Sequence, residues 1–198
     1  MRLSFIFLLL FLCSNSFGQT TCYQNLLDTA ISGRSGVFVN SKPLSVTRLD
    51  PKDMWQYIEN LREYSSQKLD TVIFSEIIYN TKLPDTALWV DEELPKSLLV
   101  KERDATVSKK YALQKLGWND DKQIRFIKRQ VNKFNSAETI DKNLSFFSRP
   151  VFDNSKTFAI VQWDNGHSYL GGGGGIILYQ LQNDMTWKEC GIISTWRY

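Results

Sequence analysis

The chain has 198 residues, with 24 Lys and Arg, 21 Asp and Glu and a single histidine, and its formal net charge is +3. This small net charge gives no indication of a nucleic-acid partner. One histidine cannot supply the two or three His or Cys ligands that a catalytic zinc site usually needs. We therefore expect no metal and no cofactor.

Residues 1–18 have the pattern of a cleavable secretory signal peptide. The start is positive, residues 3–12 are apolar apart from one Ser, and Ser16 and Gly18 occupy positions −3 and −1 of a cleavage site. The apolar run is about half the roughly 20 residues of a membrane-spanning helix. We predict cleavage near Gly18 and a secreted or periplasmic protein without a membrane span. An uncleaved anchor is the alternative.

Two cysteines, Cys22 and Cys190, remain after cleavage, whereas Cys13 lies in the signal peptide. Leu12 precedes Cys13 where a bacterial lipoprotein has a small residue, so no lipid anchor is expected. In an oxidising compartment Cys22 and Cys190 can form a disulfide that joins the first mature segment to the last strand. Two buried free thiols are the alternative, because sequence separation does not give the distance.

Most of the chain before residue 145 is predicted to be helical. Apolar residues at helical spacing, with Asp50, Asp70 and Asp120 as N-caps, predict the helices. The expected helices cover residues 22–31, 51–67, 72–80, 107–116 and the segment from the cap at 119–121 through Phe134. Between them, residues 33–46 are expected to form a loop with a short strand near Val37 and Val39. Residues 83–106 are expected to form an irregular connection, with Trp89 and Leu98–Val100 packed on the core.

The last of these helices has the clearest pattern. Ile124, Ile127, Val131 and Phe134 form an apolar stripe, whereas Phe126 lies outside it. The basic residues Lys122, Arg125, Lys128, Arg129 and Lys133 also lie off the stripe. Residues 101–133 carry ten bases and four acids, and residues 50–99 carry ten acids and five bases. This asymmetry has two interpretations. The two segments form solvated faces of one domain, or the basic segment forms a patch that binds an anionic envelope partner.

The pattern changes to strands from residue 145 onward. The strands are expected at 145–152, with Pro150 at an edge, and at 156–164, 176–182 and 186–196, with a turn at Asn183-Asp184. Helices followed by an antiparallel meander are typical of an α+β fold. We predict one domain over residues 19–198, helical to about residue 144, with an antiparallel sheet over residues 145–198.

Five consecutive glycines, Gly171 to Gly175, are the most unusual feature. They do not match a P-loop, because Ile176 and Ile177 follow where a Lys and a Ser or Thr are needed. We predict a structural or mobile hairpin loop over residues 165–175, with contact to a ligand or partner as the alternative. The candidate binding residues in and beside this loop are Asp164, His167, Gly171 and Gly173.

Catalytic residues are not indicated. Asp164, His167 and Ser168 are too close together on one loop to form a catalytic triad. A pair of carboxylates could act as acid and base if two of them converge. The candidates are Asp91, Glu92, Glu93, Asp120, Asp121, Asp153 and Asp164. Six tryptophans are expected mainly in the core, and an exposed pair would suit stacking on a glycan.

Part of the C-terminal segment resembles a known group of proteins. Residues 147–161 (FSRPVFDNSKTFAIV), Gly171 to Gly175, Leu178-Tyr179 and Trp187-Lys188 resemble small uncharacterised secreted proteins of Bacteroidetes-type bacteria with a C-terminal glycine-rich hairpin. Many members have a Cys-Gly pair in the glycine loop, which this chain lacks. The resemblance implies an exported protein with an antiparallel hairpin and brings no known activity.

The sequence favours a non-catalytic binding or accessory protein of the cell envelope or exterior. Its partner would be an envelope protein or a glycan. The alternatives are a small exported hydrolase with paired carboxylates and an immunity-type inhibitor of an exported toxin. An exposed apolar, basic or aromatic patch without a deep polar pocket would favour the binding protein.

Overall fold

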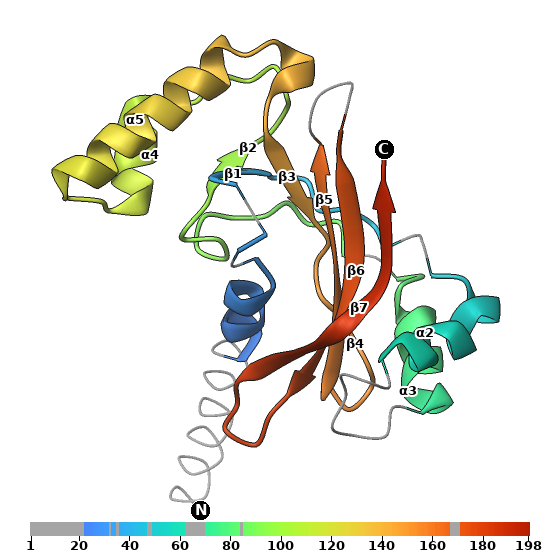
Figure 1. The fold of residues 1–198 in the computed structure, drawn as a ribbon. Helices are drawn as coiled ribbons and strands as arrows, with labels where there is room; N and C mark the ends of the chain where they lie inside the picture. The colour runs from blue at the N-terminus through green and yellow to red at the C-terminus, as the bar shows by residue number, and fades with distance from the viewer. Residues whose placement is uncertain are drawn as a thin grey trace, which may run out of the picture.

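A mixed β-sheet forms the centre of the computed structural model (Figure 1), which describes residues 22–31, 33–34, 36–46, 49–61, 70–83, 85–166 and 171–198. The described strands are β1 (Phe38–Asn40), β2 (Leu98–Val100), β3 (Leu144–Phe147), β4 (Val151–Phe152), β5 (Phe158–Gly166), β6 (Gly173–Leu181) and β7 (Trp187–Arg197). The strand order is β2-β1-β3-β5-β6-β7, and β4 pairs with β5. The predicted signal peptide and His167 lie outside the described residues.

Helices precede most of the strands in the chain, so the α+β prediction is confirmed. The described helices are residues 22–31, α2 (Met54–Leu61) after the 3₁₀ turn η1 (Pro51–Asp53), α3 (Thr71–Asn80), α4 (Lys109–Leu116), α5 (Asp121–Ser136) and the 3₁₀ turn η2 (Thr139–Asp141). Asp50, Asp70 and Asp120 accept backbone hydrogen bonds at three of the helix starts, as predicted. None of the described helices is long and apolar enough to cross a membrane.

The sheet is not confined to the C-terminal segment, which corrects the prediction of an antiparallel sheet over residues 145–198. β1 pairs in parallel with β2 and with β3, whereas the other pairs are antiparallel. β2 lies inside the connection that was expected to be irregular. Three apolar residues carry too short a pattern to indicate a strand, and the parallel partner supplies the missing hydrogen bonds.

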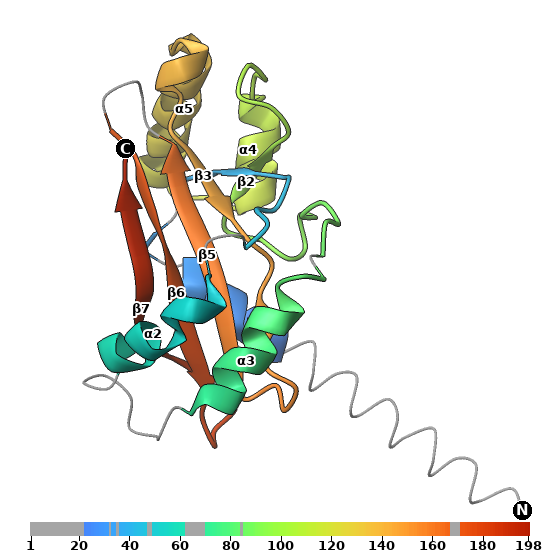
Figure 2. The ribbon, with the colours of Figure 1, turned by 90° about the vertical axis from the view of Figure 1, so that its right-hand side faces the viewer.

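The long strands β5 and β6 have one apolar core on each face. Ala159 and Val161 of β5 belong to a cluster with Leu27 of helix 22–31 and with Trp89. Phe158 and Ile160 point to the other face, as the alternating pattern predicts, and there they join the second cluster. Residues of α2 and α3 complete this second cluster: Tyr57, Ile58, Leu61, Phe74 and Ile77. Figure 2 shows α2 and α3 in front of the sheet and helix 22–31 behind it.

The α4–α5 hairpin packs at the far end of the sheet, over β1, β2 and β3. Ile127, Val131 and Phe134 of α5 are buried there, as the apolar stripe predicts. Phe134 stacks on Phe38 of β1 with ring centroids 4.2 Å apart. In Figure 1 the hairpin projects to the upper left of the sheet, so the outer side of α5 faces away from the rest of the molecule.

Of the two possibilities for Cys22 and Cys190, the structure has free thiols and not a disulfide, with Cys190 buried and Cys22 partly buried. Cys22 packs against the cluster on one face of the sheet, whereas Cys190 belongs to the cluster on the other face. Since the sheet lies between them, the two sulfur atoms cannot meet in this fold. Burial raises the pKa of the Cys190 thiol, which keeps it protonated at neutral pH.

Arg149, in the connection between β3 and β4, joins three parts of the chain. Its guanidinium makes a bidentate contact with Glu93, at 2.5 and 3.0 Å, and donates to the hydroxyl of Tyr23 at 3.1 Å. It also donates to the carbonyl oxygens of Ala87 and Leu88 and lies 4.5 Å from the centre of the Trp89 ring. The connection before β2 and helix 22–31 are thereby fixed to the sheet.

Burial by itself would lower the pKa of the Arg149 guanidinium, but its interactions with Glu93 and Tyr23 outweigh this effect and raise the pKa. Arg149 therefore stays positively charged. Only 11% of its side chain is exposed to solvent. A buried cation of this kind depends on its partners, because losing one leaves an uncompensated charge.

We expect Arg149→Ala to lower the free energy of unfolding by about 3 kcal/mol, because it leaves the Glu93 carboxylate partly buried and unpaired. Urea denaturation followed by circular dichroism measures the loss. Lys96→Ala is the matched control, since the Lys96–Asp28 pair is exposed, with 81% of the lysine side chain in solvent. This control should cost less than about 0.5 kcal/mol. Equal losses for both variants would contradict the role given to Arg149.

Candidate functional site

Part of the glycine run lies in a strand, which corrects the prediction of a hairpin loop over residues 165–175. Gly173, Gly174 and Gly175 belong to β6 and pair with Asn165, Asp164 and Trp163 of β5. On their other side they pair with Arg197, Trp196 and Thr195 of β7. Glycine is disfavoured inside strands, so a sequence pattern does not indicate one here. The two partner strands impose the extended conformation.

Two tryptophans explain why this part of β6 carries no side chains. A Cβ atom on Gly174 would lie 2.5 Å from Cζ2 of Trp196 and would collide with the carbonyl oxygen of Trp163. A Cβ atom on Gly175 would lie 3.2 Å from Nε1 of Trp163. Trp163 packs against the core cluster of one sheet face and Trp196 against that of the other. The indole rings therefore occupy the space above and below the glycines.

The candidate binding residues of this region are not gathered into one open site. Asp164 accepts hydrogen bonds from Nε1 of Trp196 at 3.2 Å and from the hydroxyl of Tyr198 at 2.9 Å, so its carboxylate fixes the end of β7. Gly173 is in the strand, and a Cβ atom there would lie 2.8 Å from the carbonyl oxygen of Trp196. Gly171 has free space around its Cα atom. His167 lies outside the described residues.

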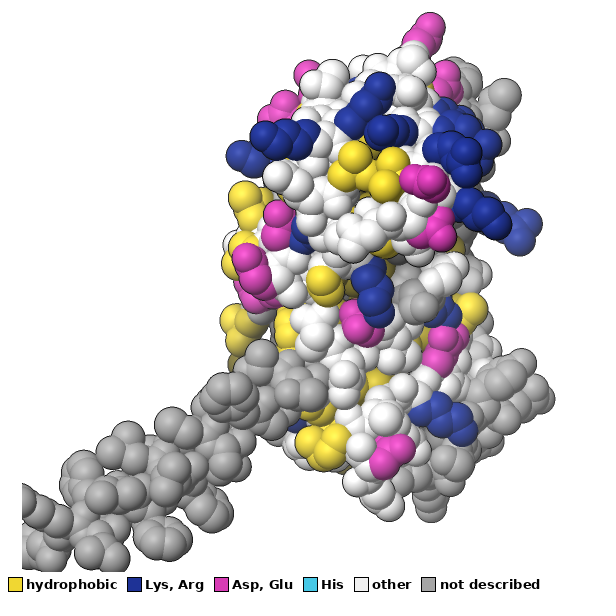
Figure 3. Space-filling model, turned by 90° about the vertical axis from the view of Figure 1, so that its left-hand side faces the viewer, with side chains coloured by type: hydrophobic (Ala, Val, Ile, Leu, Met, Phe, Trp, Pro, Cys, Tyr) yellow, Lys and Arg dark blue, Asp and Glu magenta, His cyan; other side chains and the backbone are white. Residues whose placement is uncertain are grey.

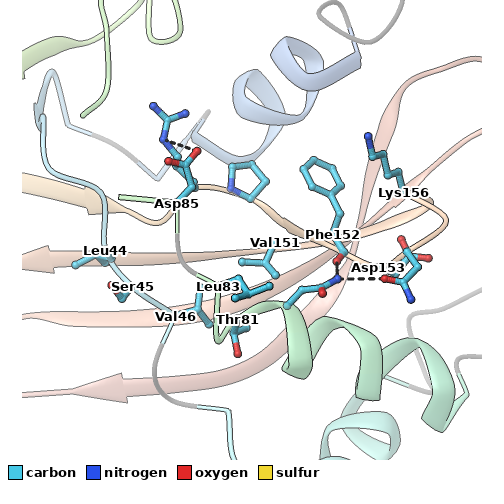
Figure 4. A pocket seen from close by; sticks show the side chains of 14 residues that line it. Leu44, Ser45, Val46, Thr81, Leu83, Asp85, Val151, Phe152, Asp153 and Lys156 are labelled. Atoms are coloured by element: carbon cyan, nitrogen blue, oxygen red, sulfur yellow. Dashed lines mark hydrogen bonds and ion pairs between the residues drawn. The ribbon is translucent and has the colours of Figure 1, made fainter. Parts of the chain in front are cut away.

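A groove of about 390 Å³ lies between the end of α3, the segment before η1 and the β4–β5 turn (Figure 4). Its size is within the range of small-ligand sites. Many of its polar groups are already engaged with the protein itself. Asn80 donates to the carbonyl oxygen of Phe152 at 2.9 Å, and Asp153 accepts from the backbone of Phe158 at 2.8 Å.

Two carboxylates line this groove, Asp85 and Asp153, of which Asp85 was not among the candidates. Figure 4 places them at opposite ends. Asp85 contacts Nε of Arg149 at 3.3 Å and accepts from the backbone of Ala87 at 2.9 Å. Asp153 is 4% exposed and accepts hydrogen bonds from three residues. The groove therefore does not present two free carboxylates on either side of a bound substrate.

Three of the other candidate acids are engaged with different parts of the protein. Asp91 pairs with Lys115 at 2.8 Å, Glu93 with Arg149, and Asp120 caps α5. The hydroxyl of Tyr111 also donates to Asp91, and burial together with this carboxylate raises the pKa of Tyr111 to about 12. No group of three or more His, Cys, Asp or Glu side chains within the described residues could hold a metal ion.

The outer side of α5 carries a row of basic side chains. An α-helix turns about 100° per residue, so Lys122, Arg125, Arg129 and Lys133 fall within an arc of about 80° opposite the buried stripe. All four are exposed. We call these four residues the basic row. It is about 16 Å long at 1.5 Å per residue.

Within the described residues, no ion pair joins an acidic side chain to the basic row. Lys109, Lys110 and Lys128 add further exposed cations to the α4–α5 hairpin. Figure 3 shows Lys and Arg side chains gathered over the end of the molecule that carries this hairpin. Acidic side chains lie between some of these cations in the same view. Phe126, 40% exposed, borders the basic row.

In comparisons with known proteins, no family model, curated protein or solved structure matches this chain.

The packing of Trp196 on the glycine strand can be tested directly. We expect Gly174→Ala to destabilise the protein by about 3 kcal/mol, because the added methyl group must displace either the indole ring or the β5 backbone. Gly171→Ala is the control, and because no atom lies within 4 Å of the new methyl group, it should change stability by less than about 0.5 kcal/mol. Thermal unfolding of the two variants measures the difference. Equal stabilities would contradict this packing.

Proposed function

We propose that the protein is an exported, non-catalytic binding protein of the cell envelope or exterior, and that the basic row of α5 binds an anionic partner. The observation that carries the proposal is the row itself: four exposed cations on one helix face, none of which forms an ion pair with another described residue. The engaged carboxylates of the groove support binding rather than acid–base catalysis, which disfavours the hydrolase alternative.

The basic row is costly for the helix that carries it. Arg125 and Arg129, and Arg129 and Lys133, are spaced four residues apart, so the Cβ atoms of like-charged residues lie about 5–6 Å from each other. Each such pair destabilises a helix by about 0.2–0.5 kcal/mol. A solvated face needs no such arrangement, since alternating acids and bases would stabilise α5. The cost is offset when an anionic partner supplies the missing counter-charges.

The first experiment measures retention on a heparin column, with heparin as the polyanionic probe. We expect K122Q/R125Q/R129Q/K133Q to bind at least about tenfold more weakly than the parent at low salt, because four charge contacts are lost. The parent should elute near physiological salt, where the screening length is about 8 Å, and the variant should elute at lower salt.

The matched control removes four exposed lysines from other parts of the surface: K42Q/K52Q/K82Q/K188Q. It lowers the net charge by the same amount, so it separates the basic row from overall charge. Binding close to that of the parent is expected. If both variants lose binding equally, the row is not a specific surface and the proposal fails.

A second measurement separates binding from a structural role. We expect K122Q/R125Q/R129Q/K133Q to be as stable as the parent or more stable by up to about 1 kcal/mol, because like-charge repulsion is relieved and Gln has a similar helix propensity. Urea denaturation gives the free energies of unfolding. A loss of more than about 1 kcal/mol would indicate that the row serves the fold.

A further inference from the structure

We propose that the anionic partner of the basic row is the surface of an anionic phospholipid bilayer, with Phe126 entering the interfacial region. This inference rests on the proposed function and adds the class of partner. It is carried by the shape of the hairpin, by the position of Phe126 at the edge of the basic row and by the burial of the opposite face of α5.

The basic row lies on a projecting helix rather than in a cleft. The α4–α5 hairpin stands at one end of the molecule (Figure 1), and the groove described above takes none of its lining residues from α4 or α5. A straight row of cations about 16 Å long can contact a flat array of anionic headgroups with all its members at once. A projecting row has no walls that could select a particular small ligand.

Phe126 provides the second observation. It follows Lys122 by four residues and precedes Arg129 by three and Lys133 by seven, so it borders one edge of the basic row on the helix surface. Its ring is 40% exposed, and the half-buried ring of Trp118 lies 6.2 Å away and supports it from the side. An aromatic ring beside a row of cations suits the bilayer interface, where headgroups meet acyl chains. A purely polar polyanion would gain little from it.

The opposite face of α5 limits how deeply the protein can bind. Ile127, Val131 and Phe134 are held in the core with Phe38 and Leu144. The apolar stripe is therefore not available to lie in the membrane, as it is in an amphipathic interfacial helix. Attachment has to come from charge and from Phe126 alone, so it should be peripheral and reversible by salt.

The expected strength follows from the number of cations. A Lys or Arg close to an anionic membrane strengthens binding by roughly fivefold. Four such residues should together strengthen binding by at least about a hundredfold, with some loss from mutual screening. Burial of the exposed part of one Phe ring should add about another fivefold.

The experiment is co-sedimentation of residues 19–198 with sucrose-loaded vesicles at low salt. Vesicles of phosphatidylglycerol and phosphatidylcholine should bind the protein, and vesicles of phosphatidylcholine alone should bind at least about a hundredfold less. K122Q/R125Q/R129Q/K133Q should lose the binding, whereas K42Q/K52Q/K82Q/K188Q should retain most of it.

Phe126→Ala distinguishes a bilayer from other polyanions. It should weaken binding to anionic vesicles about fivefold and leave retention on heparin unchanged. Binding to heparin without binding to anionic vesicles would overturn the membrane inference and leave the proposed function standing. If the parent protein binds neither heparin nor anionic vesicles, both the proposed function and the membrane inference are overturned. An equal effect of Phe126→Ala on heparin and on vesicles would remove the role given to the ring.

Discussion

The burial of β5 and β6 on both faces is the constraint on which the rest of the structure depends. A strand with two buried faces needs a layer of apolar side chains on each side. Helix 22–31 and the connection around Trp89 supply one layer, and α2 and α3 supply the other. Where the strands run past these helices, Trp163 and Trp196 take over the covering, and the glycines of β6 leave room for the two rings. Arg149 then attaches the first layer to the sheet by contacts to Glu93 and Tyr23.

Unlike β5 and β6, which are buried on two faces, the α4–α5 hairpin packs on the sheet with one face only. Its buried side adds Ile127, Val131 and Phe134 to the core beside β1 and β3. The other side is left to solvent, so its side chains are not selected for packing. A surface in this position tolerates like charges at modest cost to stability, which is why a row of four cations can persist there. The structural role and the proposed binding role of α5 thus belong to opposite faces of one helix.

Several acidic side chains hold parts of the molecule together. Asp164 fixes the end of β7, Asp153 orders the β4–β5 turn, and Glu93 holds Arg149. The cations of the basic row differ from them, because none has an ion-pair partner within the described residues. The groove near α3 remains a small surface feature whose walls are fixed by internal hydrogen bonds.

The sequence by itself determined the features that depend on neighbouring residues. Caps such as Asp120 and the apolar stripe of α5 act within one helix, and the alternation from Phe158 to Val161 acts within one strand, so their patterns are visible in the chain. The basic row follows from the same helical period. Only the tertiary structure decided which segments meet. It recruited Leu98–Val100 as a parallel strand, extended Gly173–Gly175 between two partners and placed Cys22 and Cys190 on opposite sides of the sheet. These outcomes depend on contacts between residues far apart in the chain, and no local pattern records them.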